Sequence, residues 1–245
     1  DEEAENGKVA LYTEDFNGAE GPMADNNYTG LAGANGGAAA APFEVQIGDG
    51  TSTSGYFPFY CFYNYSLSQQ LFTAAELAEA GVTGAPFNSL SWYCTASNGN
   101  MQSNITIWMA NVEETAIGGN SIMTGGMTKV YTGNMTPTVG WDEFVFNEGT
   151  FAWDGHSNIL ISVQRNNGAW ASGINWQCGT QSFTASGYSY NDSQGAYNME
   201  TNSYVFGTSG SSYGGTTTTR SNIIMKGGNR EGGISRSEER RVGEE

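Results

Sequence analysis

Short runs of alternating apolar and polar residues recur along most of the chain, and they indicate β-strands. In residues 103–112, for example, Ile105, Ile107 and Met109 share one face, while Trp108 takes the opposite one. Similar runs occupy residues 8–16, 43–50, 87–97, 127–133, 141–149, 158–166, 172–178, 203–209 and 221–227. Glycine, asparagine and aspartate separate these runs, so the pattern predicts an all-β fold, an antiparallel β-sandwich or barrel.

Residues 66–81 are the one stretch with clear helical signals. Thr73 and Glu76 have the spacing of a capping box, and Gly81 lies where a left-handed residue would end a helix. These signals predict one short helix near 74–80. Two turns are marginal alone, so we expect the helix to close one end of the sandwich with Leu77 buried. A lid or a helix that binds a partner is the alternative.

Composition divides the chain into three zones. Residues 1–42 are acidic and end in a Gly/Ala-rich linker, and they could supply a further strand. We expect residues 43–226 to form the β-sandwich module. Residues 227–245 are expected to be a disordered tail. The last ten residues, 236–245, resemble the translation of a sequencing adapter, apart from Glu244. We therefore leave them out of the fold.

The charge balance excludes several partners. The formal net charge is -16, and residues 26–225 contain only Lys129, Arg165 and Arg220 as cations. Without a basic patch, binding to nucleic acid or to an anionic membrane surface is not expected. No apolar run approaches the roughly 20 residues of a membrane span, so this segment is not expected to insert into a membrane.

The cysteines and the only histidine give no metal or redox motif. Cys61, Cys94 and Cys178 lack C-x-x-C spacing, and His156 is alone. A zinc site is therefore not expected. One disulfide with a free thiol, or three buried free thiols, are the two alternatives for the cysteines.

Five phrases in a fixed order resemble a known type of module. They are IGDGTSTSGYFPFY (47–60), YSLSQQLFTAAELAEAG (65–81), ITIWMANVEET (105–115), TFAWDGHSNILISV (150–163) and SNIIM (221–225). Together they are similar to a secreted or surface β-sandwich module of gut and oral Gram-negative bacteria, found beside fibronectin type III and cleaved-adhesin domains. The resemblance implies a jelly-roll-like accessory domain, extracellular or on the outer cell surface, without catalytic residues.

A search for catalytic or metal-binding groups gives weak candidates. His156 lies in a predicted turn, and Asp142 and Glu143 are adjacent, so a strand would point them to opposite faces. We therefore predict no enzyme and no required cofactor. Calcium is a minor option, because sandwich loops can supply its oxygen ligands. The acidic residues in predicted loops are Asp49, Glu113, Glu114, Asp154 and Asp192.

Carbohydrate binding is the most specific alternative function, because flat aromatic side chains with amide neighbours suit sugars. The candidate ligand-binding residues are Trp108, Trp170, Trp176, Tyr188 and Tyr190. The last two belong to SGYSYNDSQGAYN (186–198), a predicted loop whose composition suits adaptable contacts.

The leading hypothesis is a non-catalytic adhesion, binding or spacer module of a larger bacterial surface or secreted protein. Its partner would be a host or matrix glycan or protein, and it would work with neighbouring domains of the full-length protein. A carbohydrate-binding module is the first alternative, and an accessory domain of a secreted hydrolase is the second.

Overall fold

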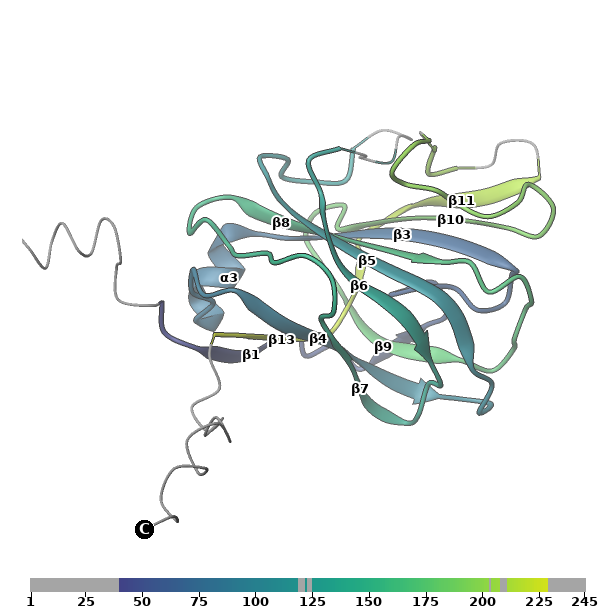
Figure 1. Cartoon of the computed structure of the whole chain (residues 1–245), viewed down its shortest axis with the longest axis horizontal. Coiled ribbons are helices and arrows are strands. Elements are labelled where there is room, and N and C mark those ends of the chain that lie inside the picture. The colour runs from purple at the N-terminus through teal and green to yellow at the C-terminus, as the bar shows by residue number, and fades with distance from the viewer. Residues whose placement is uncertain (1–39, 119–121, 123–124, 203, 208–210, 229–245) are drawn as a thin grey trace, which may run out of the picture. The chain divides into compact units, whose positions relative to one another are not determined.

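The fold is a β-sandwich of two antiparallel sheets with one short helix at one end (Figure 1). The computed structural model describes residues 40–118, 122, 125–202, 204–207 and 211–228. The predicted all-β sandwich is confirmed. The predicted strand at 8–16, the acidic segment and the tail after residue 228 lie outside the described residues.

The first sheet has seven strands. These are β1 (Phe43–Ile47), β2 (Ser52–Ser54), β4 (Phe87–Ala96), β7 (Gly140–Val145), β9 (Asn175–Thr180), β12 (Thr219–Ser221) and β13 (Ile223–Gly227). Their order is β1-β13-β4-β9-β12, with β2 on β9 and β7 on β4. The N-terminal strand β1 pairs along its length with the C-terminal strand β13, so the two ends of the described chain lie together.

The second sheet has six strands. These are β3 (Tyr65–Phe72), β5 (Gln102–Val112), β6 (Thr128–Met135), β8 (Asn158–Arg165), β10 (Ser186–Asn191) and β11 (Ser212–Thr217). Their order is β11-β10-β3-β8-β5-β6, so β11 and β6 are its edges. The segment after β7 covers the β6 edge, because the backbone N–H groups of Asn147, Glu148 and Gly149 donate to carbonyls of that strand.

Apolar side chains are buried on both faces of the six-stranded sheet. The larger cluster lies between the sheets and includes Ile107, Val163 and Trp92. A second cluster lies on the outer face, where Leu67, Leu160 and the segments around Ile117, Ile122 and Phe206 meet. Burial on both faces explains why β3 and β8 are almost continuously buried.

The helix α3 (Ala74–Ala80) forms where the sequence predicts it. Thr73 and Glu76 make both bonds of the capping box, and Gly81 ends the helix with φ 94°. Leu77 is fully buried in the core, as expected of a helix that closes the sandwich. In Figure 1 the helix lies at the end of the two layers, near β8 and β1.

Three strands of the second sheet, and one segment outside it, differ from the sequence predictions. Residues 65–72 form a central strand, which the sequence did not predict. The only signals in this region were those of the helix that follows. Residues 186–191 form β10 and not a loop, and residues 212–217 form its unpredicted partner β11. Within the predicted strand at 203–209, the described residues form no regular strand; Phe206 instead fills the outer cluster.

The three cysteines are free and buried, which is the second of the two alternatives.

Candidate functional site

Aromatic side chains from separate parts of the chain gather beside β10 and β11. They come from the loop 55–64, from the segment after β8, and from the two strands themselves. We name this set the tyrosine surface: Tyr56, Tyr60, Phe62, Tyr63, Trp170, Tyr188, Tyr190 and Tyr213. The loop 55–64, which contains Pro58, is irregular, and this path lets its rings pack against the strands.

Strand register explains why two of these tyrosines lie together. Tyr188 and Tyr190 are two residues apart on β10, so they project from the same face. Tyr188 pairs with Ser68, which pairs with Val163 of the inner core. The row therefore lies on the face directed toward the other sheet, at the edge where the loop 55–64 packs.

The rings in this row stack on one another. Tyr188 and Tyr190 are parallel within 2°, with centroids 6.1 Å apart. Tyr56 stacks on Tyr188 at 4.5 Å, and Tyr213 stacks on Tyr190 at 5.9 Å. Tyr56 therefore covers part of one face of the Tyr188 ring.

The most exposed members lie at the periphery of the set. Trp170 is 61% exposed, Phe62 is 49% exposed, and Tyr213 is 42% exposed. Phe62 and Trp170 meet edge to face with centroids 5.7 Å apart. Tyr63 links Phe62 to Tyr213, so the exposed rings are contiguous. A contiguous exposed apolar patch, unlike a single exposed ring, marks an interaction surface.

Arg165 fixes the two loops that carry Phe62 and Trp170. Its guanidinium is fully buried and donates to the backbone carbonyls of Tyr63 (2.5 Å) and Ala169 (2.8 Å). It also donates to the side chain of Gln102 at 2.7 Å. Arg165 makes no salt bridge within the described chain, and burial lowers its pKa. A cation without a carboxylate partner thus holds the tyrosine surface in place.

Packing also changes the acidity of the tyrosines. Burial, followed by neighbouring tyrosines, raises the pKa of Tyr60, Tyr188 and Tyr190. The shift is largest for Tyr190, which four other tyrosines surround. These hydroxyl groups are therefore neutral at physiological pH and can both donate and accept hydrogen bonds.

The predicted ligand-binding residues separate into two groups. Trp170, Tyr188 and Tyr190 come together in the tyrosine surface. Trp108 lies on the outer face, as its phase indicated, but the segments around Ile117, Ile122, Tyr197 and Phe206 cover it and leave only 5% exposed. Trp176 is fully buried in the inner core. Of the three candidate tryptophans, only Trp170 is therefore exposed.

Sequence reasoning missed the rest of the surface, although a signal was present. The loop 55–64 has aromatic residues at six of its ten positions, GYFPFYCFYN. Tyr213 gave no signal, because its strand is rich in glycine and threonine. Arg165 stands out only as a cation at the end of the apolar run of β8.

The acidic candidates do not gather into one cluster among the described residues. The Ser157 hydroxyl lies within hydrogen-bond distance of Asp154 (2.6 Å) and Glu113 (3.2 Å), so these two carboxylates compete for its one proton. Slight burial by itself would raise the pKa of Asp154, but hydrogen bonds from Ser157 and His156 lower it to about 2. No cluster that could hold a metal ion occurs among the described residues.

Asp142 and Glu143 on β7 lie on opposite faces, as their adjacent positions predicted. Asp142 is buried and accepts from the backbone N–H and hydroxyl of Thr138, while Glu143 on the next position is exposed and accepts from Ser89. Burial raises the pKa of Asp142.

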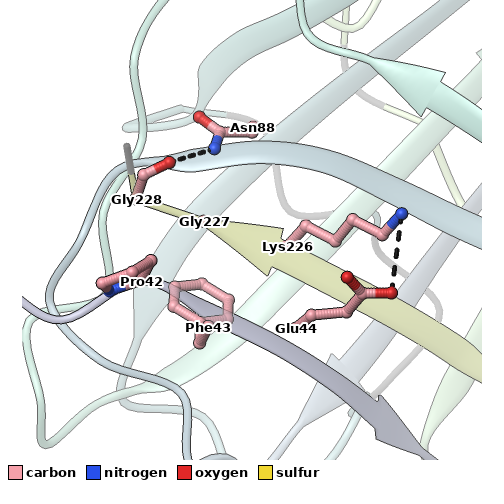
Figure 2. Close-up of a pocket in the computed structure, with 7 residues that line it drawn as sticks. All are labelled: Pro42, Phe43, Glu44, Asn88, Lys226, Gly227 and Gly228. Carbon is pink, nitrogen blue, oxygen red and sulfur yellow. Dashed lines mark hydrogen bonds and ion pairs between the residues drawn. The ribbon is translucent and has the colours of Figure 1, made fainter. Parts of the chain in front are cut away.

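A small pocket lies beside the edge strand β1 (Figure 2). It has a volume of about 280 Å³. Figure 2 shows Asn88 donating to the carbonyl of Gly228 and Lys226 paired with Glu44. These groups bond to each other across strands β1, β13 and β4, so the pocket presents few free polar groups.

No protein-family model matches this chain, and no curated protein matches it either. Among the described residues, no helix is long and apolar enough to cross a membrane.

Proposed function

We propose that this chain is a non-catalytic binding module of a larger, extracellular bacterial protein, and that the tyrosine surface contacts a protein partner. The observation that carries the proposal is the exposed aromatic periphery formed by Trp170, Phe62 and Tyr213. Tryptophan and tyrosine are enriched among the residues that dominate binding energy at protein interfaces.

Three features of the surface support a protein partner. Tyr56 covers one face of the Tyr188 ring, whereas a sugar platform needs open ring faces. Arg165 holds the supporting loops in one geometry, which lowers the entropy lost on binding. A groove of about 260 Å³ beside Tyr56 and Tyr188, lined by serine and threonine, can receive a partner's side chain.

The test compares two aromatic double variants on an array of immobilised extracellular-matrix proteins. Trp170→Ala/Tyr213→Ala removes the exposed periphery. Tyr93→Ala/Trp141→Ala removes a T-shaped pair (5.3 Å) on the other sheet and serves as the matched control. We expect the wild type and the control to bind. Trp170→Ala/Tyr213→Ala should lose at least about 2 kcal/mol of binding free energy, since hot-spot truncations cost this much or more.

Two results would contradict the proposal. Binding that survives Trp170→Ala/Tyr213→Ala would place the interface elsewhere. A chain that binds no protein on the array would act as a spacer between neighbouring domains.

A further inference from the structure

A polar groove crosses the outer face of the six-stranded sheet, where β5 begins and β6 and β8 end. We name it the carboxamide groove because Asn104, Asn134 and Gln164 line it, together with Thr106 and Tyr65. Its volume is about 790 Å³, within the range of roughly 300–1,000 Å³ for ligand sites. None of its lining residues is charged.

Two of these amides are held at one end and free at the other. The Oδ1 atom of Asn134 accepts from the backbone N–H of Asn104 at 3.0 Å, and the Oε1 atom of Gln164 accepts from the backbone N–H of Met199 at 3.2 Å. Because a backbone N–H requires an acceptor, each amide oxygen must face it. The amino groups, Nδ2 and Nε2, are left as free donors within the described chain.

Asn104 and Thr106 add acceptors to these donors. Asn104 has a left-handed φ of 52°, next to a register shift between Gln102 and Ile105; asparagine tolerates this conformation better than most residues. Its Nδ2 atom donates to the carbonyl of Asn166 at 3.2 Å, so Oδ1 is the free end. The Thr106 hydroxyl has no partner in the described chain. The groove therefore offers preset donors and acceptors side by side.

This chemistry fits hydroxyl groups on a neutral ligand. A hydroxyl both donates and accepts, so it can pair with either end of an amide. The groove has no cation for an anionic ligand, and the chain's net charge of -16 opposes one. The aromatic ring of Tyr65 supplies apolar surface for the C–H groups of a sugar.

A peptide suits the groove less well. The strands β5 and β8 are hydrogen-bonded to neighbours on both sides. Their backbone groups are therefore unavailable, and an extended peptide could not add to the sheet here. Only side-chain amides and hydroxyls are on offer.

We propose that the carboxamide groove binds a neutral oligosaccharide, through the free amide groups of Asn104, Asn134 and Gln164 and the hydroxyl of Thr106. This site is separate from the tyrosine surface, and it does not depend on the protein partner proposed above.

The experiment screens the full chain on an array of neutral oligosaccharides and then measures Kd for each hit by calorimetry. The test variant is Thr106→Val/Asn134→Ala, and Asn134→Ala alone is included because its exposed position threatens folding least. Thr216→Val is the matched control, since Thr216 is an exposed strand threonine on β11. Each lost neutral hydrogen bond weakens binding roughly two- to tenfold. We therefore expect the double variant to raise Kd by about four- to a hundredfold and the control to change Kd by less than about twofold.

The outcomes are distinguishable. Loss of sugar binding in the groove variants, with full binding by Thr216→Val and by Trp170→Ala, supports the proposal. Absence of any neutral oligosaccharide ligand overturns it. Sugar binding that survives Asn134→Ala and the double variant, or that Trp170→Ala abolishes, also overturns it. A peptide array that gives ligands sensitive to Thr106→Val/Asn134→Ala would assign the groove to peptides instead.

Discussion

Arg165 is the residue on which the geometry of the tyrosine surface depends most. Its planar guanidinium donates to groups on β5 and on the loops around Tyr63 and Ala169. A lysine carries the same charge but is a compact donor without the guanidinium fork. The position therefore requires the geometry of arginine, and not only its charge.

We expect Arg165→Lys to destabilise the fold by about 3 kcal/mol, because it leaves buried carbonyls and a buried charge incompletely satisfied. Urea unfolding measures the loss. Lys129→Ala is the comparison, since the Lys129–Glu200 ion pair is partly exposed and should contribute at most about 1 kcal/mol. Equal stabilities for the two variants would show that Arg165 does not hold these loops.

Single residues also show where sequence analysis reaches its limit. The phase of Trp108 was predictable from alternation, but its burial depends on segments near Ile117 and Phe206 that are distant in sequence. Trp170 lacks such a cover and stays exposed. Alternation gives the face on which a side chain lies, whereas tertiary packing decides whether that face meets water.

At the scale of elements, α3 was predictable because its signals are local. The capping box and Gly81 act within one turn of the residues that they stabilise. Strand β3 was not predictable in the same way, because its serines and glutamines are buried through distant partners. Gln70, for example, accepts from the backbone N–H of Ser221. β10 was missed because glycine, serine and asparagine are also typical of loops.

The helix is tied to both sheets through Glu76. Its carboxylate accepts from the backbone N–H of Thr73 and forms a two-point salt bridge with the buried Arg220 of β12, at 2.6 and 3.0 Å. Arg220 also donates to the carbonyl of Leu71 on β3 and lies 4.2 Å from the centre of the Phe72 ring. Removing the carboxylate charge would leave this guanidinium buried without its counter-charge.

We expect Glu76→Gln to lower the free energy of unfolding by about 2–3 kcal/mol at neutral pH. This value is toward the lower end for a broken buried pair, because Glu76 is partly exposed. Glu79→Gln, an exposed change on the same helix, is the control and should be nearly neutral. Burial alone would raise the pKa of Glu76, but Arg220 and Thr73 lower it. The stabilisation is therefore present above the ordinary pKa and is lost as pH falls through the folded value.

Urea unfolding at neutral and at acidic pH measures both effects. The difference between wild type and Glu76→Gln should shrink in acid, as the wild-type carboxyl group becomes protonated. A difference that stays constant down to strongly acidic pH would mean that the charge of Glu76 does not stabilise the helix.

At the scale of the whole molecule, the alternating pattern was enough to predict the sandwich, since it recurs in most of the strands. The functional surfaces were not predictable as units. The tyrosine surface joins residues near 60, 170, 190 and 213, and the carboxamide groove joins three strands. Strand order brings these segments together, and one sequence does not reveal which strands pair.

The three free cysteines report on whether the sandwich unfolds as one unit. They lie in the loop 55–64, on β4 and on β9, yet each is buried. Burial raises the pKa of Cys61 to about 12 and that of Cys94 to about 11, and it raises the pKa of Cys178. Only the thiolate reacts readily, so both protonation and lack of access protect these side chains.

We expect no thiol of the folded chain to react with a disulfide reagent on the time scale of manual mixing at neutral pH, and all three to react together on unfolding in urea. The midpoint of thiol exposure should equal that of tyrosine and tryptophan fluorescence, because two-state domains show coincident transitions. Ser182→Cys, at an exposed position, is the positive control and should react at once. Earlier exposure of Cys61 alone would mean that the loop 55–64, and with it the tyrosine surface, opens before the sheets separate.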